Sequence, residues 1–127
     1  MILIAASEKD VASLNIAKQI LANYSFRKTT KTFQENPIYL NEVNGKVVKL
    51  VTLRDETVYA QNITDMIENP ELIIFISRHS SLSGTPTLSV HTPGNLGEAR
   101  LGGFPRKVSV SPANAMRHVL MAMMRLR

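Results

Sequence analysis

Cysteine and tryptophan are both absent from this 127-residue chain. Without cysteine the chain forms no disulfide and has no thiolate nucleophile, so a bound metal would need histidine or carboxylate ligands. Aromatic residues are also scarce, and only Phe75 and Phe104 lie beyond residue 71. This scarcity disfavours a module that reads single-stranded RNA by stacking its bases on aromatic rings.

Long apolar runs and glycine-rich nucleotide motifs are missing as well. The chain has no apolar run of about eighteen residues, which a transmembrane helix requires. Its first ten residues, MILIAASEKD, lack the basic start and long apolar core of a signal peptide. We therefore expect a cytoplasmic protein with no membrane partner. Because no G-x-G-x-x-G or Walker sequence occurs, we expect no nucleotide cofactor.

Acidic residues are nearly absent from the second half of the chain. Residues 72–127 hold seven Lys or Arg and a single acid, Glu98, whereas residues 1–71 hold eight basic and nine acidic residues. The net charge is therefore +6 in the second half and −1 in the first. A basic surface of this kind attracts phosphates. The alternative is a set of surface bases, of the kind that thermostable proteins carry, that serves no anionic partner.

The remaining pattern predicts a single α/β domain over residues 1–127, with a mixed sheet and flanking helices. The apolar run 72–76 is short and unbroken, which is typical of a central strand buried on both faces. Asn44-Gly45 between two strand-like segments predicts a type I′ hairpin turn. The predicted strands are 1–5, 38–43, 46–53, 58–59, 72–76, 88–90 and 108–110, and the predicted helices are 11–22, 63–68 and 112–126.

Two helix starts are predicted from capping residues. Ser7 and Asp10, three residues apart, fit a capping box before the first helix. Ser111 followed by Pro112 fits an N-cap and first helical residue before the last helix. The apolar stripes expected to face the core are Val11, Leu14, Ala17 and Leu21 in the first helix, and Met116, Val119, Leu120 and Met123 in the last.

Two strand-like segments end in loops that carry histidine. The run 72–76 is followed by SRHSS at 77–81, and the run 88–90 is followed by HTPGN at 91–95. Because side chains at the carboxyl ends of neighbouring strands meet in one crevice, we predict a site that contains both histidines, with the two imidazoles within about 10 Å of each other. The alternative is that each histidine and each loop is only structural.

These residues resemble a known family. SRHSS, HTPGN, the later Gly102-Gly103, Asn15-Ile16 and the Ser111–Met116 helix entry are together similar to the archaeal and plant type of D-aminoacyl-tRNA deacylase. The resemblance implies hydrolysis of the ester between a D-amino acid and tRNA. It also implies a zinc cofactor, and a fold of phosphorylase-like or peptidyl-tRNA-hydrolase-like character.

The chain departs from that family in length. Members are about twice as long, and their T-H-H-G-P, E-I-G-S and G-G-x-H-Y motifs do not occur here. The last helix also has no Gly, Asn or Pro stop signal. We therefore expect the chain to be the N-terminal part of a longer deacylase, with weak activity or none by itself. We expect it to be a monomer whose partner is D-aminoacyl-tRNA rather than DNA.

The candidate site residues come from the two loops and the basic half. His79 and His91 are each a candidate general base or metal ligand, with Glu98 as a weaker third ligand. The catalytic candidates are His79, His91, Arg78, Ser80 and Asn95. The substrate-binding candidates are Ser81, Gly94, Gly102, Gly103, Arg100, Arg106 and Lys107. His118 lies inside the last helix and is interpreted as structural.

Two other functions remain open at this stage. A non-catalytic tRNA-binding or RNA-binding domain would need the same positively charged face but no general base. A peptidyl-tRNA hydrolase would share the fold character and cleave substrates with a blocked amino group.

Overall fold

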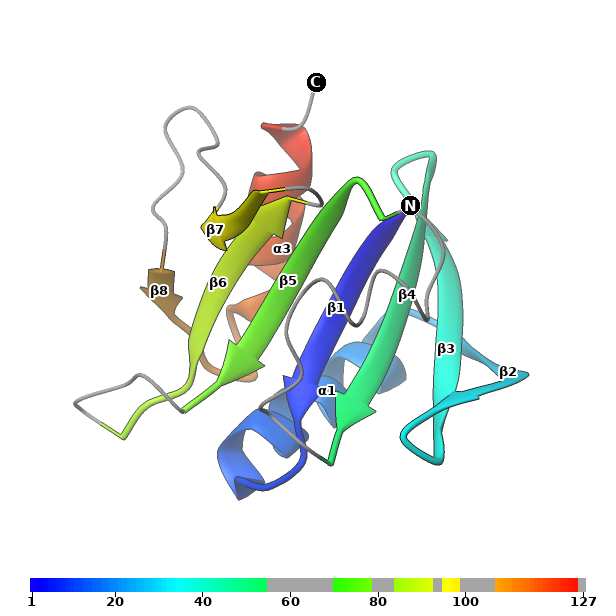
Figure 1. Ribbon diagram of the computed structural model, residues 1–127, viewed down its shortest axis with the longest axis horizontal. Coiled ribbons are helices and arrows are strands. Elements are labelled where there is room, and N and C mark those ends of the chain that lie inside the picture. The colour runs from blue at the N-terminus through cyan, green and yellow to red at the C-terminus, as the bar shows by residue number, and fades with distance from the viewer. Residues whose placement is uncertain (55–69, 79–83, 93–94, 99–106, 126–127) are drawn as a thin grey trace.

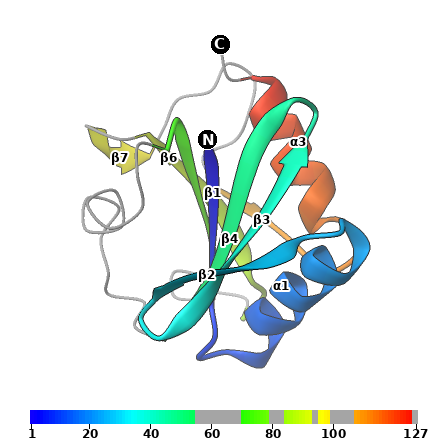
Figure 2. The same ribbon diagram turned by 90° about the vertical axis from the view of Figure 1, so that its right-hand side faces the viewer.

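The computed structural model describes residues 1–54, 70–78, 84–92, 95–98 and 107–125. Within these ranges the chain forms an eight-stranded mixed sheet with two helices on one of its faces (Figures 1 and 2). The predicted α/β class with a mixed sheet is therefore confirmed. The elements are β1 (Ile2–Ser7), α1 (Val11–Asn23), β2 (Arg27–Phe33), β3 (Asn36–Val43), β4 (Lys46–Leu53), β5 (Leu72–Ser77), β6 (Thr87–Thr92), β7 (Asn95–Glu98), β8 (Lys107–Ser109) and α3 (Ala115–Met124).

Strand β1 lies in the middle of the sheet, between two parallel neighbours. The strand order is β2-β3-β4-β1-β5-β6-β7, and β8 pairs with β6 beside β7. Both β4 and β5 run parallel to β1, whereas every other pairing among the described strands is antiparallel. The carboxyl ends of β1, β4 and β5 therefore lie at one edge of the sheet, and β6 starts at that edge and runs away from it (Figure 1).

The face of the sheet that carries α1 and α3, here called the first face, holds the larger core. Alternate residues of β1 and β5 point into it, among them Ile4 and Ile74, and neither is exposed. The intervening residues Leu3 and Ile73 are also buried, on the opposite side. Burial on both faces explains why these strands read as unbroken apolar runs. The prediction of a central buried strand at 72–76 is confirmed.

The opposite face, here called the second face, has a smaller core. The β2–β3 hairpin contributes Phe33 and Ile38, which pack with Leu3, Val51 and Ile73. Figure 2 shows the two helices on the other side of the sheet. Among the described residues, no helix lies on the second face.

Helix α1 begins at Val11, as predicted, and one of the two residues of the predicted capping box caps it. Asp10 is the N-cap, and its carboxylate accepts a hydrogen bond from the Ser13 backbone N–H at 2.7 Å. Ser7 ends β1 and its hydroxyl accepts from the Lys9 N–H at 3.2 Å. Of the two residues in the predicted capping box, Asp10 therefore caps the helix and Ser7 does not, because β1 continues through Ser7.

The buried stripe of α1 also differs from the predicted one. Val11 is 73% exposed, and the buried residues are Ser13, Ile16, Ala17 and Ile20. The helix has apolar side chains on two adjoining faces, so periodicity alone could not decide which face packs on the sheet.

Helix α3 follows a short turn instead of starting at Pro112. The Asn114 side chain accepts a hydrogen bond from the Ser111 N–H at 2.8 Å, and the first helical residue is Ala115. The predicted N-cap at Ser111 was wrong for this reason. The predicted stripe is largely confirmed, since Met116, Val119 and Met123 are buried, and Leu120 is partly buried against the same core.

The turns show which local signals were strong. Asn44 and Gly45 have φ angles of 52° and 78°, which confirms the predicted type I′ turn between β3 and β4. Strand β2, with the sequence RKTTKTF, was not predicted because it is an edge strand without apolar alternation.

The predicted segments 58–59 and 63–68 lie outside the described residues. In the part of the chain that is described, no helix is long and apolar enough to cross a membrane.

Substitution of Asp10 tests whether its side chain caps the start of α1. We expect Asp10→Ala to lower the free energy of unfolding by about 1 kcal/mol, because one amide at the helix start loses its acceptor. Asp10→Asn keeps an acceptor and should cost a few tenths of that amount. Urea unfolding followed by circular dichroism measures both variants, and an equal cost for the two would contradict capping by the side-chain oxygen.

Candidate functional site

Among the predicted site residues, His91 has the most informative surroundings. It lies on β6, where Leu88 and Val90 point into the core of the first face. Because side chains alternate along a strand, His91 and Ser89 lie on the second face. The register places His91 beside Ile73 and Ser89 beside Phe75, both on β5.

The imidazole of His91 is held between two neighbours. Its ring and the Phe75 ring meet edge to face, with their centroids 5.2 Å apart and their planes at 85°. The Ser89 hydroxyl lies 3.2 Å from His91 Nε2, within hydrogen-bond distance. His91 Nδ1 is buried. Either Ser89 or Nε2 can be the donor, according to which ring nitrogen carries the proton.

A cationic residue, Lys107, flanks Ser89 on the side away from β5. Strand β8 pairs with β6 so that Lys107 lies beside Ser89. Directly paired residues project from the same face, so Phe75, Ser89 and Lys107 form a row across three strands on the second face. Lys107 is exposed. We call Phe75, Ser89, His91 and Lys107 the β6 cluster.

The segment SRHSS follows β5, and β5 ends at the edge of the sheet opposite to the one where β6 ends. Strands β5 and β6 are antiparallel, and the register pairs Ser77 with Thr87 and Ile73 with His91. The prediction that the two loops leave the sheet at one edge was wrong, because it assumed parallel strands. Arg78 is exposed at the carboxyl end of β5, and a Cβ at Gly84 would lie 2.9 Å from its guanidinium.

Most other predicted residues are not placed by the structure. Asn95 begins β7, with Thr92 of β6 as its Cα partner. Because His79 is not described, its distance from His91 stays a prediction. The predicted residues outside the described ranges are His79, Ser80, Ser81, Gly94, Arg100, Gly102, Gly103 and Arg106.

The described residues do not make up a zinc site. Of the two predicted ligands only His91 is among them, and no group of three His, Asp or Glu side chains in the described ranges could hold a metal ion. One histidine falls short of the three protein ligands that a catalytic zinc normally takes. Zinc therefore stays an implication of the resemblance, and no step below depends on it.

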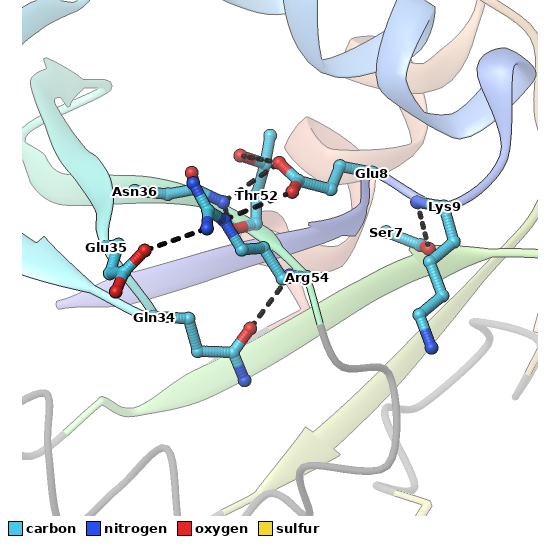
Figure 3. Close-up of polar contacts among 8 residues, drawn as sticks. All are labelled: Ser7, Glu8, Lys9, Gln34, Glu35, Asn36, Thr52 and Arg54. Atoms are coloured by element: carbon cyan, nitrogen blue, oxygen red, sulfur yellow. Dashed lines mark hydrogen bonds and ion pairs between the residues drawn. The ribbon is translucent and has the colours of Figure 1, made fainter.

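A second polar cluster was not predicted from the sequence. It lies at the carboxyl edge of β1 and β4, where the Glu8 carboxylate accepts a hydrogen bond from the Asn36 amide at 2.9 Å (Figure 3). The same amide donates to the Thr52 carbonyl at 2.8 Å, and Arg54 Nε lies 3.5 Å from Glu8. Asn36 is only 9% exposed. The signal in the sequence was weak, because Glu8, Asn36 and Arg54 come from three separate segments.

This second cluster fastens the β2–β3 hairpin to the sheet. Gln34 and Glu35, in its turn, have φ angles of 52° and 66°, which are strained for residues other than glycine. Arg54 ties down both, since its N–H donates to the Gln34 side chain and its guanidinium to Glu35, each at 2.8 Å (Figure 3). Every charged group here has a partner from the fold itself, which indicates a structural role.

Comparison with known proteins separates the two clusters. A family model described as D-aminoacyl-tRNA deacylase matches residues 66–127. The whole β6 cluster lies inside that match, whereas Glu8, Asn36 and Arg54 lie outside it.

Curated relatives extend the similarity to the whole chain. D-aminoacyl-tRNA deacylases from Thermococcus onnurineus, Pyrococcus horikoshii and Methanosarcina acetivorans are 34%, 36% and 37% identical to it, over 97%, 99% and 98% of its length. The chain is homologous to the archaeal D-aminoacyl-tRNA deacylases. It spans about half the length of these relatives, 46%, 46% and 44% respectively. The resemblance predicted from the sequence is confirmed.

The deacylase match directs attention to the β6 cluster. The segment that the deacylase model recognises contains β5, β6, β7, β8 and α3. Within it, His91 is the one described side chain that has both an imidazole and a hydroxyl neighbour on the second face. An imidazole is the side chain best suited to exchange a proton near neutral pH. We therefore take the β6 cluster as the candidate catalytic site.

The structural role of the second cluster can be tested by charge. We expect Asn36→Asp to destabilise the fold by about 1–3 kcal/mol at pH 7, because a second carboxylate replaces the amide that donates to Glu8. The loss should shrink as the pH falls and a carboxylate gains a proton. Asn41→Asp, on a half-buried side chain that donates to the Tyr24 carbonyl outside this cluster, is the matched control. Equal losses in the two variants at pH 7 would contradict a specific role for Asn36.

Proposed function

We propose that this chain is part of an ester hydrolase that acts on D-aminoacyl-tRNA and releases the tRNA and the free D-amino acid. The observation that carries the proposal is His91, held by Ser89 and Phe75 within the segment that matches the deacylase model. The names of the similar proteins support the substrate class. Such a substrate further implies that the protein works in the cytoplasm.

The chemistry of the substrate suits a site of this kind. An aminoacyl ester is already activated, so its hydrolysis needs a positioned water, a group that takes the water's proton, and a grip on the tRNA phosphates. In the proposed arrangement His91 takes the proton. Lys107, exposed on the same face, supplies positive charge for a phosphate or for the developing oxyanion.

Substitution of His91 tests the catalytic part of the proposal. We expect His91→Ala to lower the rate of D-aminoacyl-tRNA hydrolysis by about 10²-fold or more, since general-base catalysis contributes about 10²–10⁴-fold. The rate should be measured in single turnovers with the protein in excess, so that slow hydrolysis by a chain of half the family's length is detected. L-aminoacyl-tRNA should be spared.

A matched histidine provides the control. His118 lies on α3, outside the β6 cluster, so His118→Ala should leave the rate unchanged. If the wild-type chain binds tRNA but never hydrolyses it, the alternative of a non-catalytic tRNA-binding domain replaces this proposal. Hydrolysis of N-blocked peptidyl-tRNA in preference to D-aminoacyl-tRNA would point to the peptidyl-tRNA hydrolase instead.

Salt dependence tests the contact with tRNA. The logarithm of tRNA affinity should fall linearly with the logarithm of salt concentration, because bound phosphates release counterions. Lys107→Ala should reduce the slope by about one if Lys107 contacts a phosphate. Lys46→Ala is the control, because its ammonium pairs with Glu71 at 3.1 Å on β4, away from β6. An unchanged slope in Lys107→Ala would remove Lys107 from the tRNA contact.

A further inference from the structure

One of the two ring nitrogens of His91, Nδ1, is closed to solvent. Nδ1 is buried, although the residue as a whole is only half-buried. The contact with the Phe75 ring fixes the plane of the imidazole. Any proton that His91 exchanges with a molecule on the second face must therefore pass through Nε2.

The Ser89 hydroxyl lies 3.2 Å from Nε2, within hydrogen-bond distance. The two residues are fixed relative to each other because they are neighbours on one face of the same strand, and β6 is paired at Ser89 with both β5 and β8. A serine hydroxyl can donate one proton and accept another at the same time. It can therefore pass a proton without moving away from the imidazole.

We propose that the Ser89 hydroxyl is a proton relay between the attacking water and His91 Nε2. This inference rests on the proposed function. As the water oxygen bonds to the ester carbonyl carbon, the water gives a proton to Ser89 Oγ, and Oγ gives its own proton to Nε2. When the tetrahedral intermediate breaks its bond to the ribose oxygen, the proton returns by the same route to that oxygen. The products are the free D-amino acid and the tRNA hydroxyl, and Ser89 and His91 regain their starting states.

The surroundings of Ser89 favour a relay over a nucleophile that forms an acyl-enzyme. Nucleophilic serines of the elbow type project from a sharp turn between a strand and a helix. Ser89 instead lies within the regular ladder of β6, and Phe75 and Lys107 flank it on the two neighbouring strands. These side chains leave the hydroxyl better placed to contact a small water than to bond to the carbonyl carbon of a bulky ester.

The experiment compares the wild-type chain with Ser89→Ala, Ser89→Thr and Thr87→Val. Thr87 lies two residues earlier on the same face, and its hydroxyl donates to the Ser77 carbonyl at 3.4 Å, so Thr87→Val removes a hydroxyl without touching His91. In single-turnover hydrolysis of D-aminoacyl-tRNA, Ser89→Ala should lower the maximal rate by about 10²-fold with unchanged half-saturation. The maximal rate of Ser89→Thr should stay within tenfold of the wild-type rate, and the maximal rate of Thr87→Val should equal the wild-type rate.

A proton inventory in mixtures of light and heavy water distinguishes a relay from a structural role. With the relay, the rate should depend on deuterium content along a curve, because two protons move together, and the dependence should become linear in Ser89→Ala. Full activity of Ser89→Ala while His91→Ala is inactive would overturn the relay and leave the proposed function in place. Capture of an acyl group on Ser89 after quenching would show a nucleophile and also overturn it. If the wild-type chain hydrolyses nothing, the proposed function fails and the relay fails with it.

Discussion

The hydrogen-bonded ladder of three parallel strands, β4-β1-β5, is the constraint on which the rest of the structure depends. β1 has a neighbour on each side and is buried on both faces, so its backbone groups are paired and its side chains are in the core. Parallel strands need long crossovers, and the β1 to β4 connection provides α1 and the β2–β3 hairpin. Those two elements then cover opposite faces of the same ladder.

The antiparallel strands added beyond β5 create the candidate site. β6 returns along β5 and so places His91 beside Ile73, near the start of β5 and away from the carboxyl end of that strand. Pairing with β8 brings Lys107 beside Ser89, although eighteen positions of sequence separate them. The β6 cluster is thus a product of strand pairing, because each of its contacts either joins adjacent strands or follows from the two-residue period of β6.

The two polar clusters differ in composition and in their place along the chain. At the edge of β1 and β4, Glu8 and Arg54 are paired by groups from the fold, and their bonds hold a strained turn in place. In the β6 cluster a titratable imidazole meets a hydroxyl, with an exposed cation in the same row. The β6 cluster lies in the part of the chain that matches the deacylase model, whereas Glu8 and Arg54 lie outside it.

The sequence by itself determined the α/β class, the central strand at 72–76, the hairpin at Asn44-Gly45 and the relationship to the deacylases, because apolar runs, turn residues and short motifs are local signals. It also pointed to His91. The strand direction of β6 was decided only by tertiary structure, since an apolar run has the same pattern in a parallel or an antiparallel strand. For the same reason the contact of His91 with Phe75 and the pairing of Ser89 with Lys107 could not be predicted from the sequence. The two-residue spacing of Ser89 and His91 is present in the sequence, but it places them on one face only once β6 is known to be a strand.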